Sequence, residues 1–192
     1  CSIPFFLDRP RVVHWHPLIV FLSGVLELVT YDWKTETVMQ VLKSDLTPGS
    51  RYEVDCLENH VLANGIDGYL WREPGVLAKI RSDLGEDIAL DDKLMPLFTF
   101  YEKAVAAKET PILGRQLMTA LWSLLEEYSI PARLDYWVNQ EGSSLLHGSL
   151  SQGSSIQSAE EHRGIWSLWV DLVDDFMRSL GNTPLKWEQF AS

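Results

Sequence analysis

The residues best suited to chemistry are the two histidines of His14-Trp15-His16. On a strand, residues two apart face the same side, so both imidazoles could reach one metal ion. Zinc needs at least one further ligand, and nothing in the spacing of the other histidines and carboxylates requires them to converge. Two histidines alone often form an ordinary polar face. The sequence therefore favours a protein without a metal or other cofactor, and a metal site at His14 and His16 is the alternative.

A second candidate is the segment 141–157, in which six serines and three glycines gather. Gly148 and Gly153 have the spacing of a phosphate-binding P-loop, but Ser154 stands where the lysine must be. Ser151 misses the G-x-S-x-G of a nucleophile elbow by one residue. Both motifs are therefore rejected. A loop of this length is either functional or disordered.

Charge and aromatic content point to binding rather than catalysis. The formal net charge is −11, and no segment forms a basic stripe, so the sequence argues against a nucleic-acid partner. Eight tryptophans are many for 192 residues, and several lie in turns or near chain ends. We expect Trp33, Trp71, Trp137 and Trp187 to anchor a basic protein partner at the surface. The alternative is that these turn aromatics fold back onto the core.

The elements that position these residues change in kind along the chain. Residues 11–42 are expected to form two or three strands of a meander, although 18–29 could equally be a buried helix. From residue 46 the sequence shows helix start signals, because Thr47-Pro48 and Thr110-Pro111 each offer an N-cap residue followed by proline. A capping box at 158–161 opens the last long helix.

These patterns predict an α+β fold in which a small N-terminal antiparallel sheet packs against a mainly helical C-terminal portion. We expect a single domain over 1–192, strand-rich in 1–45 and mainly helical in 46–192, with the Gly/Ser-rich loop at 141–157. No apolar run reaches the roughly 20 residues of a membrane span. The two cysteines favour a cytoplasmic protein. If Cys1 is a processed N-terminus, a bacterial lipoprotein or a secreted protein is the alternative.

The function that follows is a non-catalytic acidic protein-binding domain of the inhibitor, immunity or adaptor type, which engages a basic partner. No convincing catalytic set argues for an enzyme. The alternative is a small-molecule or metal-dependent enzyme that uses residues 141–157 as an active-site lid over the histidines. A third hypothesis is a structural component of a larger assembly, including a homo-oligomer.

Overall fold

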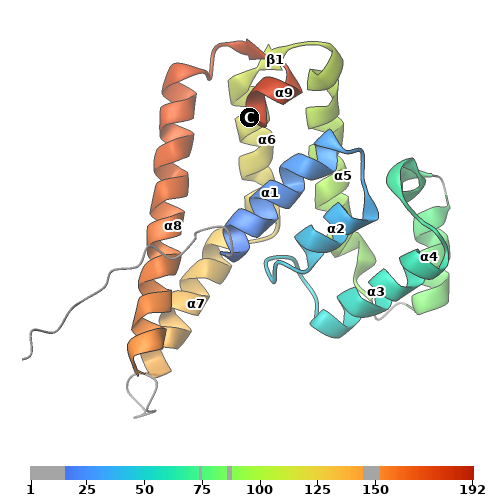
Figure 1. Cartoon of the computed structure of the whole chain (residues 1–192), viewed down its shortest axis with the longest axis horizontal. Coiled ribbons are helices and arrows are strands. Elements are labelled where there is room, and N and C mark those ends of the chain that lie inside the picture. Colours follow the sequence, from blue (N-terminus) through green and yellow to red (C-terminus); the bar gives the residue numbers. More distant parts are fainter. Residues whose placement is uncertain (1–15, 74, 86–87, 145–151) are drawn as a thin grey trace, which may run out of the picture.

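The computed structural model describes residues 16–73, 75–85, 88–144 and 152–192, and the side chains of all of these except 140–144 and 152–158. Figure 1 shows that helices make up nearly all of this structure. In chain order the elements are α1 (Pro17–Thr30), α2 (Thr35–Leu42), α3 (Arg51–Ala63), the 3-10 helix η2 (Gly68–Arg72), α4 (Val76–Leu84), α5 (Leu90–Glu109), β1 (Ile112–Leu113), α6 (Gly114–Glu127), α7 (Ile130–Ser144), α8 (Gln152–Ser179), β2 (Pro184–Leu185) and α9 (Trp187–Phe190).

The predicted N-terminal sheet is wrong, because the described part of 1–45 is helical. The buried residues of α1 recur at helical spacing, so that one stripe faces the core: Leu18, Phe21, Leu22, Val25, Leu28 and Val29. Pro17 occupies the first turn, where its missing N–H costs nothing. A buried apolar run fits a strand or a helix, and here its length of 14 residues suits the helix.

The strands of the described residues form one very small sheet. β1 pairs with β2 antiparallel, with Ile112 opposite Leu185 and Leu113 opposite Pro184. This ladder joins the chain before α6 to the chain after α8, as the top of Figure 1 shows. The fold is therefore helical with a strand clip, and not a sheet packed against helices.

The helices pack in pairs around one core. The most extensive contacts join α7 to α8, α1 to α2, and α5 to α6. In Figure 1 the long helix α8 stands at one side, and α3 and α4 lie at the other. Buried apolar residues from α1 through α9 form one continuous cluster.

The helical prediction for the rest of the chain holds, with different boundaries. The capping box of α3 uses Ser50 and Glu53 rather than Thr47. Helix α8 already begins at Gln152, and α7 runs to Ser144, so much of the expected loop at 141–157 is helix. Residues 145–151 lie outside the described residues. No helix among those that the structure describes is both long enough and apolar enough to cross a bilayer.

Candidate functional site

Three hollows in the described surface hold polar side chains that could act on a ligand. The largest of them, about 480 Å³, lies between α4 and α5, and we call it the aromatic hollow. Its lining is mainly apolar, but it includes the charged residues Arg72, Glu73 and Glu102. The full lining is Trp71, Arg72, Glu73, Gly75, Leu77, Met95, Phe98, Tyr101, Glu102 and Val105. Such a lining suits an uncharged apolar group and disfavours an anion.

A hydrogen-bonded triad fixes the wall of the aromatic hollow. The Tyr101 hydroxyl donates to Asp32 Oδ1 at 2.5 Å, and Arg72 donates to the same Oδ1 at 2.7 Å and to Tyr101 Oη at 3.0 Å. Burial, together with the hydrogen bond to Asp32, raises the pKa of Tyr101 to about 12. The hydroxyl therefore stays protonated at neutral pH. The triad holds the turn after α1, where Asp32 has a left-handed φ of 55°.

The second hollow, between α7 and α8, contains His162 near the start of α1. His16 Nε2 lies 2.8 Å from His162 Nδ1, and the N–H of Leu18 donates to His16 Nδ1 at 3.2 Å. Because Nδ1 accepts, the proton of neutral His16 resides on Nε2 and is donated to His162. Burial, and the neighbouring imidazole second, lower the pKa of His16 to about 4. His16 therefore caps α1 through Nδ1 and contacts His162 through Nε2.

The alternative metal site is not assembled by the described residues. His16 meets His162, but no group of three or more His, Cys, Asp or Glu side chains in the described part could hold a metal ion. His14 lies outside the described residues. The sequence did not indicate His162 as the partner of His16, because 146 residues separate them.

The third hollow lies between α5 and the first turns of α6, and we call it the polar groove. It measures about 400 Å³ and is lined by Lys103, Arg115, Gln116, Thr119, Ala120 and Ser123. Two side chains are cations, three are neutral hydrogen-bonding groups, and none is a carboxylate. Among the three hollows this lining alone combines net positive charge with several neutral polar groups, which is the chemistry that recognises phosphate.

Two elements position the polar groove. On α6, Gln116, Thr119 and Ser123 recur three and four residues apart and therefore share one face. The opposite face carries Leu117, Leu121 and other buried residues, so it turns toward the core. Lys103 comes from the exposed side of α5, which packs along α6.

Three of the four tryptophans expected at the surface lie in the core. Trp33 and Trp71 are fully buried, and Trp187 is 1% exposed. Partners far along the chain hold two of these rings: Trp71 Nε1 donates to Thr35 Oγ1 at 3.0 Å, and Trp187 Nε1 donates to Thr30 Oγ1 at 2.9 Å. These three rings offer no surface to a partner, because they are packed into the core.

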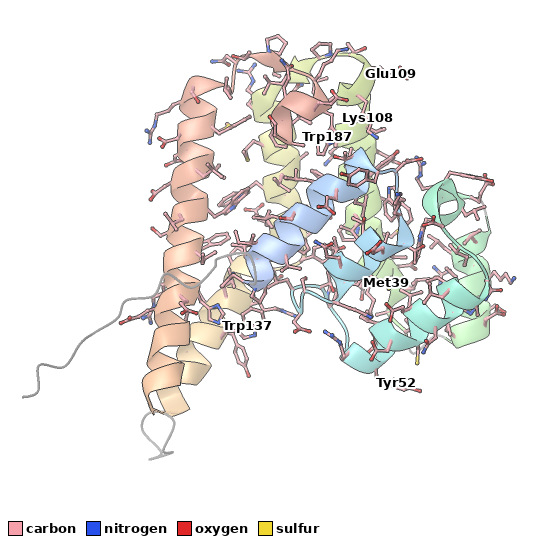
Figure 2. All side chains as sticks on the ribbon, in the orientation of Figure 1. Met39, Tyr52, Lys108, Glu109, Trp137 and Trp187 are labelled. Carbon is pink, nitrogen blue, oxygen red and sulfur yellow. The ribbon has the colours of Figure 1, made fainter. Side chains whose placement is uncertain are left out.

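Trp137 is the exception, since it is only partly buried on α7 (Figure 2). Its ring centroid lies 5.3 Å from that of His162. It therefore packs against His162, one of the residues that line the second hollow. A binding role for Trp137 stays a prediction.

Sequence reasoning missed the residues of the polar groove. The signal was present only in part, because Gln116, Thr119 and Ser123 recur at helical spacing but the carboxylate of Glu127 follows on the same face one turn later. Lys103 could not be added to that face from sequence, because only the packing of α5 on α6 brings it there. The partners Asp32, Arg72 and Tyr101 gave no signal, since each lies tens of residues from the others.

Comparison with known proteins gives the chain its context. No family model matches the chain. The chain is 34% identical over 203 residues to an ATP-dependent helicase/deoxyribonuclease subunit from Moorella thermoacetica, and the match covers 100% of this chain and 17% of that protein. It is 34% identical over 209 residues to the protein of the same name from Heliobacterium modesticaldum, covering 99% of this chain and 16% of the relative.

These relatives overturn the function expected from the sequence. A non-catalytic acidic binding domain with a basic protein partner and no nucleic acid is wrong, because the proteins that match the whole chain are named as DNA-processing subunits. The physical error was to treat net charge as if it were uniform over the surface. The polar groove shows that a local cationic lining exists within a strongly acidic protein. The chain is thus similar along its whole length to about 17% of an ATP-dependent helicase/deoxyribonuclease subunit.

Proposed function

We propose that this chain is a helical part of a DNA-processing protein of the ATP-dependent helicase/deoxyribonuclease kind, and that it takes part in ATP-dependent unwinding or cutting of DNA. The observation that carries this proposal is the extent of the match: 34% identity that covers 100% of this chain. A match of this extent includes every described helix, and not one short motif.

The fold supports a role as one rigid unit in that larger protein. The core runs without a break from α1 to α9, and the clip between β1 and β2 joins the chain before α6 to the chain after α8. We therefore propose that residues 1–192 act as a single domain. ATP-dependent processing of DNA, as proposed here, also favours a cytoplasmic location for the protein.

A chimera tests the proposal directly. The segment of the Moorella thermoacetica protein that aligns with this chain would be replaced by the chain, and ATP-dependent DNA unwinding and degradation would be measured with the chimeric protein in its normal assembly. We expect the chimera to retain measurable activity, because a segment of the same fold preserves the contacts that its neighbours need.

The control is a chimera that carries a helical domain of equal length from an unrelated protein. If the chain supports no more activity than that control, while circular dichroism shows the chimeric protein to be folded, the proposal is refuted. Activity above the control supports it.

A further inference from the structure

We propose that the polar groove between α5 and α6 binds phosphate groups of the DNA backbone, an inference that rests on the proposed function above. The groove is the place in the described surface where two cations, an amide and two hydroxyls line one hollow without a carboxylate. Phosphate contacts of this kind position a protein on DNA and do not depend on base sequence.

The two cations are available for a ligand. Lys103 is exposed and makes no ion pair with any residue that the structure describes. Arg115 donates from Nη1 to Asn182 Oδ1 at 2.6 Å. This hydrogen bond orients the guanidinium and leaves its other N–H groups to donate to phosphate oxygens. The groove therefore holds one oriented cation and one flexible cation.

The neutral groups add donors between the cations. The Gln116 side chain accepts the N–H of Leu113 at its Oε1, 3.1 Å away, so its amide NH₂ is turned away from that contact and can donate. The hydroxyls of Thr119 and Ser123 make no hydrogen bond among the described residues. Each can donate to an anionic oxygen, which makes a stronger hydrogen bond than a neutral acceptor does.

The ligand is held by side chains and not by the N-terminus of α6. The N–H of Gly114 donates to Thr183 O and the N–H of Arg115 to Gly181 O, both at 2.9 Å. These amides are already satisfied by the chain that follows α8. The same two bonds fix the start of α6, so the groove is formed before a ligand arrives.

The surroundings select the phosphate backbone over the bases. No aromatic side chain lines the groove, so there is no surface on which a base could stack. The neighbouring small hollow shares Lys103, Ala120 and Ser123 with the groove and is also lined by Glu127, one helical turn after Ser123. That carboxylate marks where the lining without carboxylates ends on α6.

The test is DNA binding by the 192-residue chain, measured by fluorescence anisotropy with a labelled random-sequence oligonucleotide in single-stranded and duplex form. Replacing both cations, Lys103→Ala with Arg115→Ala, should weaken binding about tenfold at roughly 50 mM salt and lower the slope of log Kd against log salt by about 1 to 2. The matched control is Lys34→Ala with Lys79→Ala, which removes two exposed cations elsewhere and should change neither quantity by more than about twofold.

A second variant separates the hydroxyls from the charges. Thr119→Ala with Ser123→Ala should weaken binding about threefold with an unchanged salt slope, because it removes donors and no charge. Inorganic phosphate should compete no better than chloride at equal ionic strength, which distinguishes a backbone site from a site for free phosphate.

Each outcome decides the inference. If the groove variant and the control bind alike, or if the chain binds no DNA even at low salt, the inference is overturned. Selective competition by inorganic phosphate overturns it as well. None of these results depends on the chimera, whose activity tests the proposed function independently.

Discussion

The buried ammonium group of Lys93 offers the sharpest test of the energetics of this fold. Its side chain is fully buried, and Nζ lies 2.6 Å from Glu53 Oε2 and 3.5 Å from Ala89 O. Glu53 is partly exposed, and hydrogen bonds from Lys93 and Ser50 lower the pKa of its carboxyl to about 2. The two partners of this ion pair therefore differ: Glu53 also contacts solvent and Ser50, whereas the buried ammonium of Lys93 has Glu53 as its one charged partner among the described residues.

This asymmetry predicts unequal effects of neutralising each partner. Glu53→Gln keeps the capping box of α3, because glutamine also serves at that position, but leaves a buried cation with neutral acceptors only. We expect a loss of about 3 kcal/mol in the free energy of unfolding. Lys93→Met removes the buried charge and keeps an apolar chain of similar length, while the Glu53 carboxylate retains solvent and the N–H and O–H donors of Ser50. Its cost should be below about 1.5 kcal/mol.

The double variant completes the test. With Met at position 93, Glu53→Gln should cost less than about 0.5 kcal/mol, so the coupling between the two sites is about 2 to 3 kcal/mol. Urea unfolding, followed by the fluorescence of the buried tryptophans, measures all four proteins. If Lys93→Met is more destabilising than Glu53→Gln, the ion pair itself is the main source of stability at this site and the reasoning from burial fails.

Three further predictions follow from single contacts. His16→Asn keeps an N-cap acceptor but cannot titrate. Because folding lowers the pKa of His16 from 6.5 to about 4, the wild-type chain should lose about 1 kcal/mol more stability than this variant as pH falls from about 6.5 to 4, after allowance for the partial exposure of His16. Urea unfolding of both proteins at the two pH values measures the difference. Gly114→Ala should lower the free energy of unfolding by about 2 kcal/mol or more, because the new Cβ would lie 2.6 Å from a backbone oxygen. At Gly164 a new Cβ meets nothing within 4 Å, so Gly164→Ala should stabilise α8 by about 0.5 to 1 kcal/mol. Thermal unfolding compares the two variants. Tyr101→Phe leaves Asp32 with one donor fewer and should lower the free energy of unfolding by about 1 to 2 kcal/mol, with no change in the helical circular dichroism signal.

What the sequence could predict depended on whether the deciding interaction was local. Capping boxes and threonine–proline pairs are local, and the helical character of the chain beyond residue 46 followed from them. The run 18–29 was ambiguous because a continuous apolar run fits a buried strand or a buried helix, and periodicity alone does not separate the two. Its outcome was decided by α2 and α5, which pack against α1.

The positions of the tryptophans show the same limit. Trp33 follows α1 in a turn, and a turn residue can point either way. Here its backbone takes a left-handed φ of 63°, and the ring stacks on Phe98 at 4.2 Å. Phe98 lies 65 residues further along the chain, so no local pattern could reveal that contact. Aromatic content predicted four indole rings at the surface, whereas three of them are buried and local sequence did not show that Trp137 would be the partly exposed one.

Net charge misled for a reason that can itself be tested. At physiological salt the Debye length is about 8 Å, so a phosphate in the polar groove senses Lys103 and Arg115 but is screened from distant carboxylates. In Figure 1, α3 and α4 lie at the lower right of the molecule, away from the start of α6 at the top.

Asp55→Asn with Asp83→Asn, on α3 and α4, makes the net charge two units more positive and should change the DNA affinity of the chain by less than about twofold at roughly 150 mM salt. Thr119→Glu, a single carboxylate placed inside the groove, should weaken DNA binding about tenfold or more under the same conditions. The comparison is made by anisotropy with one labelled duplex. The local effect of the groove is refuted if DNA affinity changes by the same factor per unit of charge in both variants. Total charge would then govern DNA binding, and the position of a charge in the groove would have no separate effect.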